Sequence, residues 1–99
     1  MRILLDQNVP VGVRSIIRRN HPEHQVDTAY ERDWSGLSNG TLLASAEAEG
    51  FDLLVTCDQN LTRQQNLAGR RIRIAVLWTN RWRLLQADAD RVELIVEGS

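Results

Sequence analysis

The sequence predicts an α/β fold, a three-layer α/β/α sandwich around a mostly parallel sheet of about four strands. Short apolar segments alternate along the chain with amphipathic, helix-like segments, which is the order that parallel sheets with right-handed crossovers require. Within residues 51–57 the apolar side chains are continuous rather than alternating, which is typical of a parallel strand buried on both faces. Residues 1–99 are expected to form a single domain, because this length suits one core.

The first half of the chain predicts two strands and one helix. The first strand ends at Leu5, and Asn8 is expected to cap the next helix, with Pro10 in its first turn. Helical spacing places one apolar stripe on that helix, consisting of Val9, Val13, Ile16 and Ile17. Asn20 and Pro22 end the helix, and residues 25–29 are expected to form the second strand.

The second half continues the alternation. A polar connection over residues 30–38 leads to a helix that is capped by Ser38 or Asn39 and runs to Glu49, with Gly50 in a left-handed conformation after it. Residues 51–57 form the third strand, and residues 59–68 are expected to be a loop with a turn or two of helix. Residues 72–78 form the fourth strand, and residues 80–97 form a final helix that breaks near Ala87.

Composition excludes several classes of function. The formal net charge is -1, so the overall charge does not indicate a nucleic-acid binder. All basic residues other than histidine are arginines, and without lysine the chain cannot use a lysine nucleophile or serve as a phosphorylation-receiver domain. The single cysteine, Cys57, excludes an internal disulfide and a cysteine-rich zinc site, and is expected to be a small core residue. No apolar run approaches the roughly 20 residues of a membrane span, so a cytoplasmic protein is expected.

Two carboxylates follow apolar segments in matching positions. Asp6 begins an Asp-Gln-Asn triplet after Leu5, and Asp58 begins the same triplet after residues 53–57. Ligands of an open parallel sheet bind outside the carboxyl ends of its strands, so the two side chains are expected to share one crevice. An Asp in this place also often caps a helix or orders a turn through its own backbone, and that alternative stays open for each of them.

A divalent cation is the expected occupant of that crevice, because two facing carboxylates repel each other unless a proton or a cation lies between them. Mg2+ and Mn2+ suit hard oxygen ligands, and either ion can activate water for attack on a phosphodiester. Side-chain amides could hold metal-bound water or a phosphate, with capping, turn and surface roles as alternatives; these amides are Gln7, Asn8, Asn39, Gln59 and Asn60. Capping is the favoured interpretation of Asn8.

Arginines and tryptophans gather around the fourth strand. Arg70, Arg71 and Arg73 precede it, whereas Trp78, Arg81, Trp82 and Arg83 follow or end it. This combination could hold phosphates and stack bases, although scattered surface arginines with buried tryptophans would give the same pattern. The two histidines, His21 and His24, are expected to be solvated loop residues rather than metal ligands.

Four segments together resemble a PIN-like domain family of small bacterial and archaeal proteins, namely residues 1–10, 34–40, 55–61 and 64–71. The resemblance implies a PIN-like sandwich and Mg2+- or Mn2+-dependent cleavage of RNA by a toxin of a toxin–antitoxin pair. It matches Asp6 and Asp58 to the family's catalytic acids, with Asn60 as a third metal ligand. RNA would then be held by Asn8, Asn39, Gln59, Arg70, Arg71 and Arg73. The implied partners are RNA and an antitoxin protein, and exposed tryptophan also suits a homodimer.

This sequence departs from the family pattern at two positions. Thr41 and Asn60 stand where related sequences often carry acids, so two carboxylates remain of the usual three or four. Fewer charged ligands imply weak metal binding. The alternative function is therefore a catalytically weak or inactive PIN-like module that binds RNA or a partner protein.

Overall fold

The computed structural model describes residues 1–65 and 67–98, which form an α/β fold around a four-stranded sheet. Every pair of neighbouring strands is parallel, and the strand order is β2-β1-β3-β4. The strands are β1 (Arg2–Leu5), β2 (Gln25–Thr28), β3 (Leu53–Thr56) and β4 (Arg73–Val76). The prediction of an α/β chain with a parallel sheet is confirmed.

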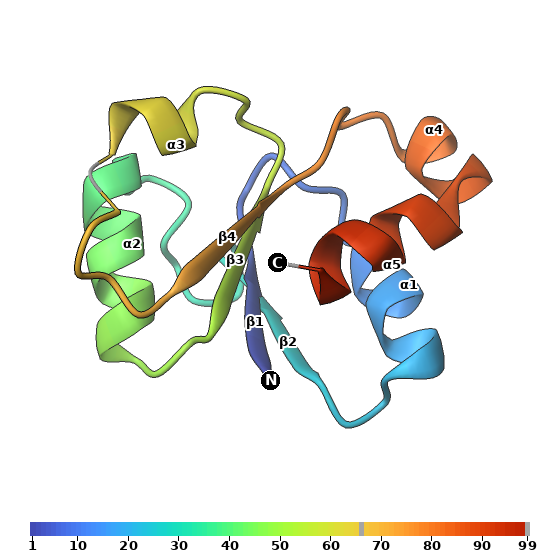
Figure 1. Ribbon diagram of the computed structural model, residues 1–99, viewed down its shortest axis with the longest axis horizontal. Helices are drawn as coiled ribbons and strands as arrows, with labels where there is room; N and C mark the ends of the chain where they lie inside the picture. Colours follow the sequence, from blue (N-terminus) through green and yellow to red (C-terminus); the bar gives the residue numbers. More distant parts are fainter. Residues whose placement is uncertain (66, 99) are drawn as a thin grey trace.

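Helices lie on both sides of the sheet (Figure 1). One side carries α1 (Val13–Asn20), α4 (Trp82–Ala87) and α5 (Ala89–Glu97), and the other carries α2 (Asn39–Ala48) and α3 (Leu61–Gln64). None of the helices in the described part of the chain is long and apolar enough to cross a membrane.

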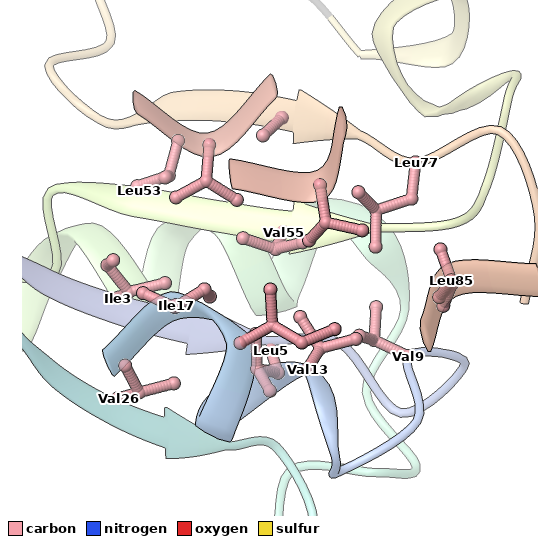
Figure 2. Packing of buried hydrophobic residues seen from close by; sticks show 14 residues of the cluster. Ile3, Leu5, Val9, Val13, Ile17, Val26, Leu53, Val55, Leu77 and Leu85 are labelled. Atoms are coloured by element: carbon pink, nitrogen blue, oxygen red, sulfur yellow. The ribbon is translucent and has the colours of Figure 1, made fainter. Parts of the chain in front are cut away.

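Successive side chains of the central strands enter opposite cores, because side chains alternate along a strand. On β1, Ile3 and Leu5 join the core beneath α1 and α5, whereas Leu4 joins the core beneath α2. Leu53, Val55 and Leu54 of β3 divide in the same way. Figure 2 shows the side chains of β1, β3 and α1 that meet in the first of these cores. The expectation that the third strand is buried on both faces is confirmed.

The start of the first helix was predicted wrongly. α1 begins at Val13 with Gly12 in the capping position, so Asn8 does not cap it. The intervening residues form turns. In these turns the carbonyl oxygen of Pro10 accepts the N–H of Val13, and that of Val11 accepts the N–H of Arg14. The apolar stripe is nevertheless present, since Val13, Ile16 and Ile17 are all buried.

The ends of the other long helices lie within two residues of their predicted positions, with α2 ending at Ala48 rather than Glu49 and α4 beginning at Trp82 rather than at residue 80. Ser38 caps α2 by accepting a hydrogen bond from the Thr41 backbone N–H at 3.4 Å. Gly50 has a φ of +85°, the left-handed conformation that glycine adopts without steric cost. The C-terminal helical segment divides into α4 and α5 at Asp88, next to the predicted break at Ala87.

Close packing, rather than backbone conformation, restricts position 12 to glycine. Its φ of -59° and ψ of -20° are open to any residue. A Cβ atom built there would lie 2.5 Å from a ring carbon of Trp82, so the indole of α4 packs directly on this backbone.

Gly12→Ala is therefore expected to lower the free energy of unfolding by about 1–3 kcal/mol, the usual effect of overpacking. Urea denaturation measures the change. Gly36→Ala is the matched control, because nothing lies within 4 Å of a Cβ at that position. The packing explanation also requires that the cost shrink in a Trp82→Leu background; an equal cost in both backgrounds would contradict it.

Candidate functional site

The candidate site lies at the carboxyl ends of β1 and β3, where the strand order reverses. The chain leaves β1 for β2 on one side of it and later returns to β3 on the other. In open parallel sheets, ligands bind at such a switch point. The loops that follow β1, β3 and β4 all emerge at this end of the sheet (Figure 1). Asp6 follows β1 directly, and Asp58 lies two residues after β3.

Asp6 is a buried carboxylate whose two oxygens both accept hydrogen bonds. Its side chain is 7% exposed; Oδ1 accepts the backbone N–H of Gln7 at 2.8 Å, and Oδ2 accepts the hydroxyl of Thr56 at 2.9 Å. In the described part of the chain, no arginine or histidine forms an ion pair with it. Burying a charge without a counter-charge is costly, so this position favours a cation.

Thr56 links the Asp6 carboxylate to the backbone of Asp58, and it was not among the predicted site residues. Its fully buried hydroxyl donates to Asp6 and accepts the backbone N–H of Asp58 at 3.1 Å. The sequence signal that could have identified Thr56 is a hydroxyl residue at the end of an apolar run, two positions before Asp58. One buried oxygen thus fixes the relative placement of Asp6 and Asp58.

Asn8 orders the same edge instead of capping α1. Its side-chain Oδ1 accepts the backbone N–H of Cys57 at 3.0 Å, and the amide lies 3.5 Å from the Thr56 hydroxyl. This bond satisfies a backbone donor just beyond β3 and ties the loop after β1 to that strand.

Asp58 is half-buried and also accepts hydrogen bonds on both oxygens. Oδ1 accepts the backbone N–H of Asn60 at 2.9 Å, which is the turn-ordering role open to any Asp at a strand end. Oδ2 accepts the side-chain amide of Asn39 at 3.2 Å. Because Ser38 caps α2, the Asn39 side chain is left to reach across to Asp58.

The remaining predicted amides differ in what they contact. Asn60 is exposed, occupies the position before α3 and makes no side-chain capping bond. The side chain of Gln59 donates to the carbonyl oxygen of Leu77 at 2.6 Å, so it holds the loop to the end of β4. Gln7 borders a pocket beside Asp6.

Arg70, Arg71 and Arg73 are not brought to the carboxylates. Arg73 is the first residue of β4 and pairs in register with Leu53, the first residue of β3, so these arginines lie at the opposite end of the sheet. Arg70 lies 3.9 Å from the carboxylate of Glu47. Arg81 and Arg83 follow β4, so they come after the same end of the sheet as Asp6 and Asp58.

Both tryptophans near the fourth strand take part in packing. The guanidinium of Arg91 lies 4.1 Å from the ring centroid of Trp78. The Trp82 ring packs on Gly12, and it also lines a surface pocket with Arg81, Arg83, Leu84 and Ala87.

The expectation that both histidines are solvated was wrong for His24. His24 is 7% exposed, and its ring nitrogens lie 3.0 Å from the Met1 amine and 3.0 Å from a carboxylate oxygen of Glu97. Together with Glu23, the two histidines are the one group of three or more potential metal ligands in residues 1–65 and 67–98. His24 already bonds to Met1 and Glu97, and His21 bonds to Glu23, so hydrogen bonding within the protein accounts for the grouping of these side chains.

Cys57 is a weakly acidic thiol beside the carboxylates. Its Sγ donates to the carbonyl oxygen of Thr79 at 3.2 Å. Burial, with a smaller contribution from the negative charge of Asp6, raises the pKa of Cys57 from 9.0 to about 11. The thiolate is the reactive form, so this cysteine is unsuited to nucleophilic catalysis at neutral pH.

The pH dependence of Cys57 alkylation should reveal this environment. In the folded protein we expect labelling by iodoacetamide to keep rising up to about pH 11, since a raised pKa leaves less thiolate at any lower pH. Asp6→Asn should lower the pKa of Cys57 and speed labelling at pH 8, whereas Asp88→Asn, at an exposed carboxylate, should not. A plateau in labelling near pH 9 would show that the thiol is not shielded.

A scan against protein-family models and searches of curated proteins and of solved structures give no match to this chain.

Proposed function

We propose that this protein is a Mg2+- or Mn2+-dependent endoribonuclease of toxin–antitoxin type, built as a PIN-like three-layer α/β/α sandwich. The observation that supports it most is the buried Asp6 carboxylate at the switch point of the sheet, which has no cationic side-chain partner among the described residues. Thr56 joins this carboxylate to the backbone of Asp58. The helices on both faces of the sheet support the layered PIN-like assignment. Cleavage of cellular RNA would take place in the cytoplasm.

The donor set fits such an ion. Among the described residues, each side-chain oxygen of Asp6 and Asp58 accepts one hydrogen bond. An ionised carboxylate has about four lone-pair sites, so acceptor capacity remains on both. Mg2+ is commonly held by one or two carboxylates and keeps several waters. Asn60, exposed beside Asp58, is available as a neutral third ligand.

The protein's own groups would divide the work by position. Asp6 and Asp58 hold the ion, while Thr56 and Asn8 keep them and the end of β3 in place. A bound ion supplies charge neutralisation at the phosphodiester and a more acidic water. Among the arginines, Arg81 and Arg83 lie at the correct end of the sheet to receive the RNA backbone, and both are exposed. Arg70, Arg71 and Arg73 would contact only RNA that extends around the domain.

A second candidate function has one specific observation in its favour. The Asn39 amide donates to Asp58, where a cation would otherwise supply the positive charge. With a neutral donor already in place, the domain could bind RNA or an antitoxin protein through the same edge and cleave nothing.

The two functions separate in one set of measurements on the purified protein. The nuclease is expected to bind Mn2+ at millimolar or lower concentration by calorimetry, and to cleave RNA in a reaction that EDTA stops. The non-catalytic module is expected to bind RNA or its partner equally in EDTA and to cleave at no protein concentration. Cleavage that persists in EDTA would contradict the metal-dependent proposal.

A further inference from the structure

A pocket of about 530 Å³ opens directly beside Asp6, between the loops that follow β1 and β2. Its lining includes Asp6 and Gln7, which follow β1, and Thr28, Tyr30 and Glu31 from the end of β2 and the loop after it. Since Asp6 is also part of the proposed metal site, an occupant of this pocket would lie next to the reacting phosphodiester.

The walls of the pocket combine exposed apolar surface with a few polar groups. Tyr30 is 82% exposed and Val11 is 64% exposed, the two most exposed large apolar side chains along this edge. The phenol of Tyr30 belongs to the loop after β2 and therefore stands free of both cores. An exposed aromatic ring beside an apolar pocket is the usual platform on which a base stacks.

The charge of the lining favours a neutral ligand over an anion. The lining contains two carboxylates, Asp6 and Glu31, and one arginine, Arg14. Arg14 already donates to Glu31, which also accepts the backbone N–H of Thr28 at 3.0 Å. A phosphate placed here would meet two carboxylates and a cation that is already paired. A flat heterocycle with N–H groups on its edge would meet acceptors on that edge and apolar atoms on its faces.

We propose that this pocket binds one nucleobase of the RNA substrate, stacked on Tyr30, with the adjoining phosphodiester directed to the ion that Asp6 and Asp58 would hold. This inference rests on the proposed function for its choice of RNA. The base-binding step itself needs neither an ion nor catalysis, so it can be tested separately.

The sequence contains one tyrosine, so replacing tyrosine by 3-fluorotyrosine gives a single 19F signal, at Tyr30. In EDTA, adenosine is expected to shift this signal saturably, whereas ribose at equal concentration is not. An equal shift by ribose would overturn the proposal, because the pocket would then recognise the sugar rather than the base.

Variants test the same pocket with a longer ligand. Tyr30→Ala is expected to weaken binding of a 2′-O-methyl RNA hexanucleotide by roughly tenfold in fluorescence anisotropy, and Tyr30→Phe is expected to keep wild-type affinity within about threefold. Leu94→Ala is the matched control, since Leu94 is 74% exposed on α5 and does not line the pocket. Equal affinities for the wild type and Tyr30→Ala would refute stacking on Tyr30.

The outcomes keep this inference apart from the proposed function. RNA cleavage together with a 19F signal that adenosine does not shift would leave the nuclease standing and remove the base pocket. An adenosine-dependent shift in a protein that never cleaves RNA would support the pocket and favour the non-catalytic module.

Discussion

Asp6→Asn is expected to reduce metal-dependent RNA cleavage about a hundredfold or more while leaving the fold at least as stable as the wild type. The loss of activity follows because an amide oxygen is a weaker ligand for a hard cation than a carboxylate. The readouts are RNA cleavage in Mn2+ and thermal unfolding in EDTA.

Stability should survive because the local hydrogen bonds can be kept. The Asn oxygen can still accept the Gln7 N–H, and its NH2 group can donate to the Thr56 hydroxyl, which lies 3.5 Å from the alternative acceptor Asn8 Oδ1. The change also removes a buried charge that has no cationic side-chain partner in the described part of the chain, so the melting temperature in EDTA should be unchanged or higher.

This pairing of lost activity with kept stability distinguishes a site from a structural carboxylate. Asp88→Asn, at an exposed position with no side-chain capping bond, is the control for the charge change. A marked fall in the melting temperature of Asp6→Asn would mean that Asp6 is present to hold the turn after β1. Unchanged cleavage would show that another protein is responsible for the nuclease activity.

The sheet could be predicted from the sequence because its signals are local. The apolar run of β3 is long enough to indicate burial on both faces, and glycine at position 50 marks the helix end that it occupies. Asn8 shows where local signals fail. Its preference for helix caps is a property of the residue type, whereas its actual bond is to Cys57, 49 positions away. His24 was misjudged for the same reason, since its partners lie 23 and 73 positions away.

The sequence did contain the information needed to place Arg70, Arg71 and Arg73 relative to the carboxylates. In a sheet whose strands are all parallel, residues before a strand and residues after it lie at opposite ends. Arg73, at the start of β4, is therefore far along the strand from Thr56, which pairs in register with Val76. Arg81 and Arg83, which follow β4, are the arginines at the end of the sheet where Asp6 and Asp58 lie.

Asn60→Asp is expected to strengthen Mn2+ binding about tenfold, equivalent to about 1.4 kcal/mol. The substitution adds a carboxylate at the N-cap position of α3, two residues after Asp58. The Oδ1 atom of Asp58 accepts the backbone N–H of this residue. Without metal, the two neighbouring carboxylates repel each other; a divalent ion relieves that repulsion and gains a charged ligand. The increase in melting temperature on adding Mn2+ should therefore be larger for this variant than for the wild type.

Gln86→Glu adds the same charge at an exposed position on α4 and serves as the control. If the wild type cleaves RNA weakly because it holds the ion weakly, Asn60→Asp should also raise cleavage at low Mn2+ concentration, where occupancy limits the rate. If it gains in affinity without gaining in cleavage, the non-catalytic module is favoured. Mn2+ binding no tighter than that of Gln86→Glu would place Asn60 outside the reach of the ion and leave Asp6 and Asp58 as the whole ligand set.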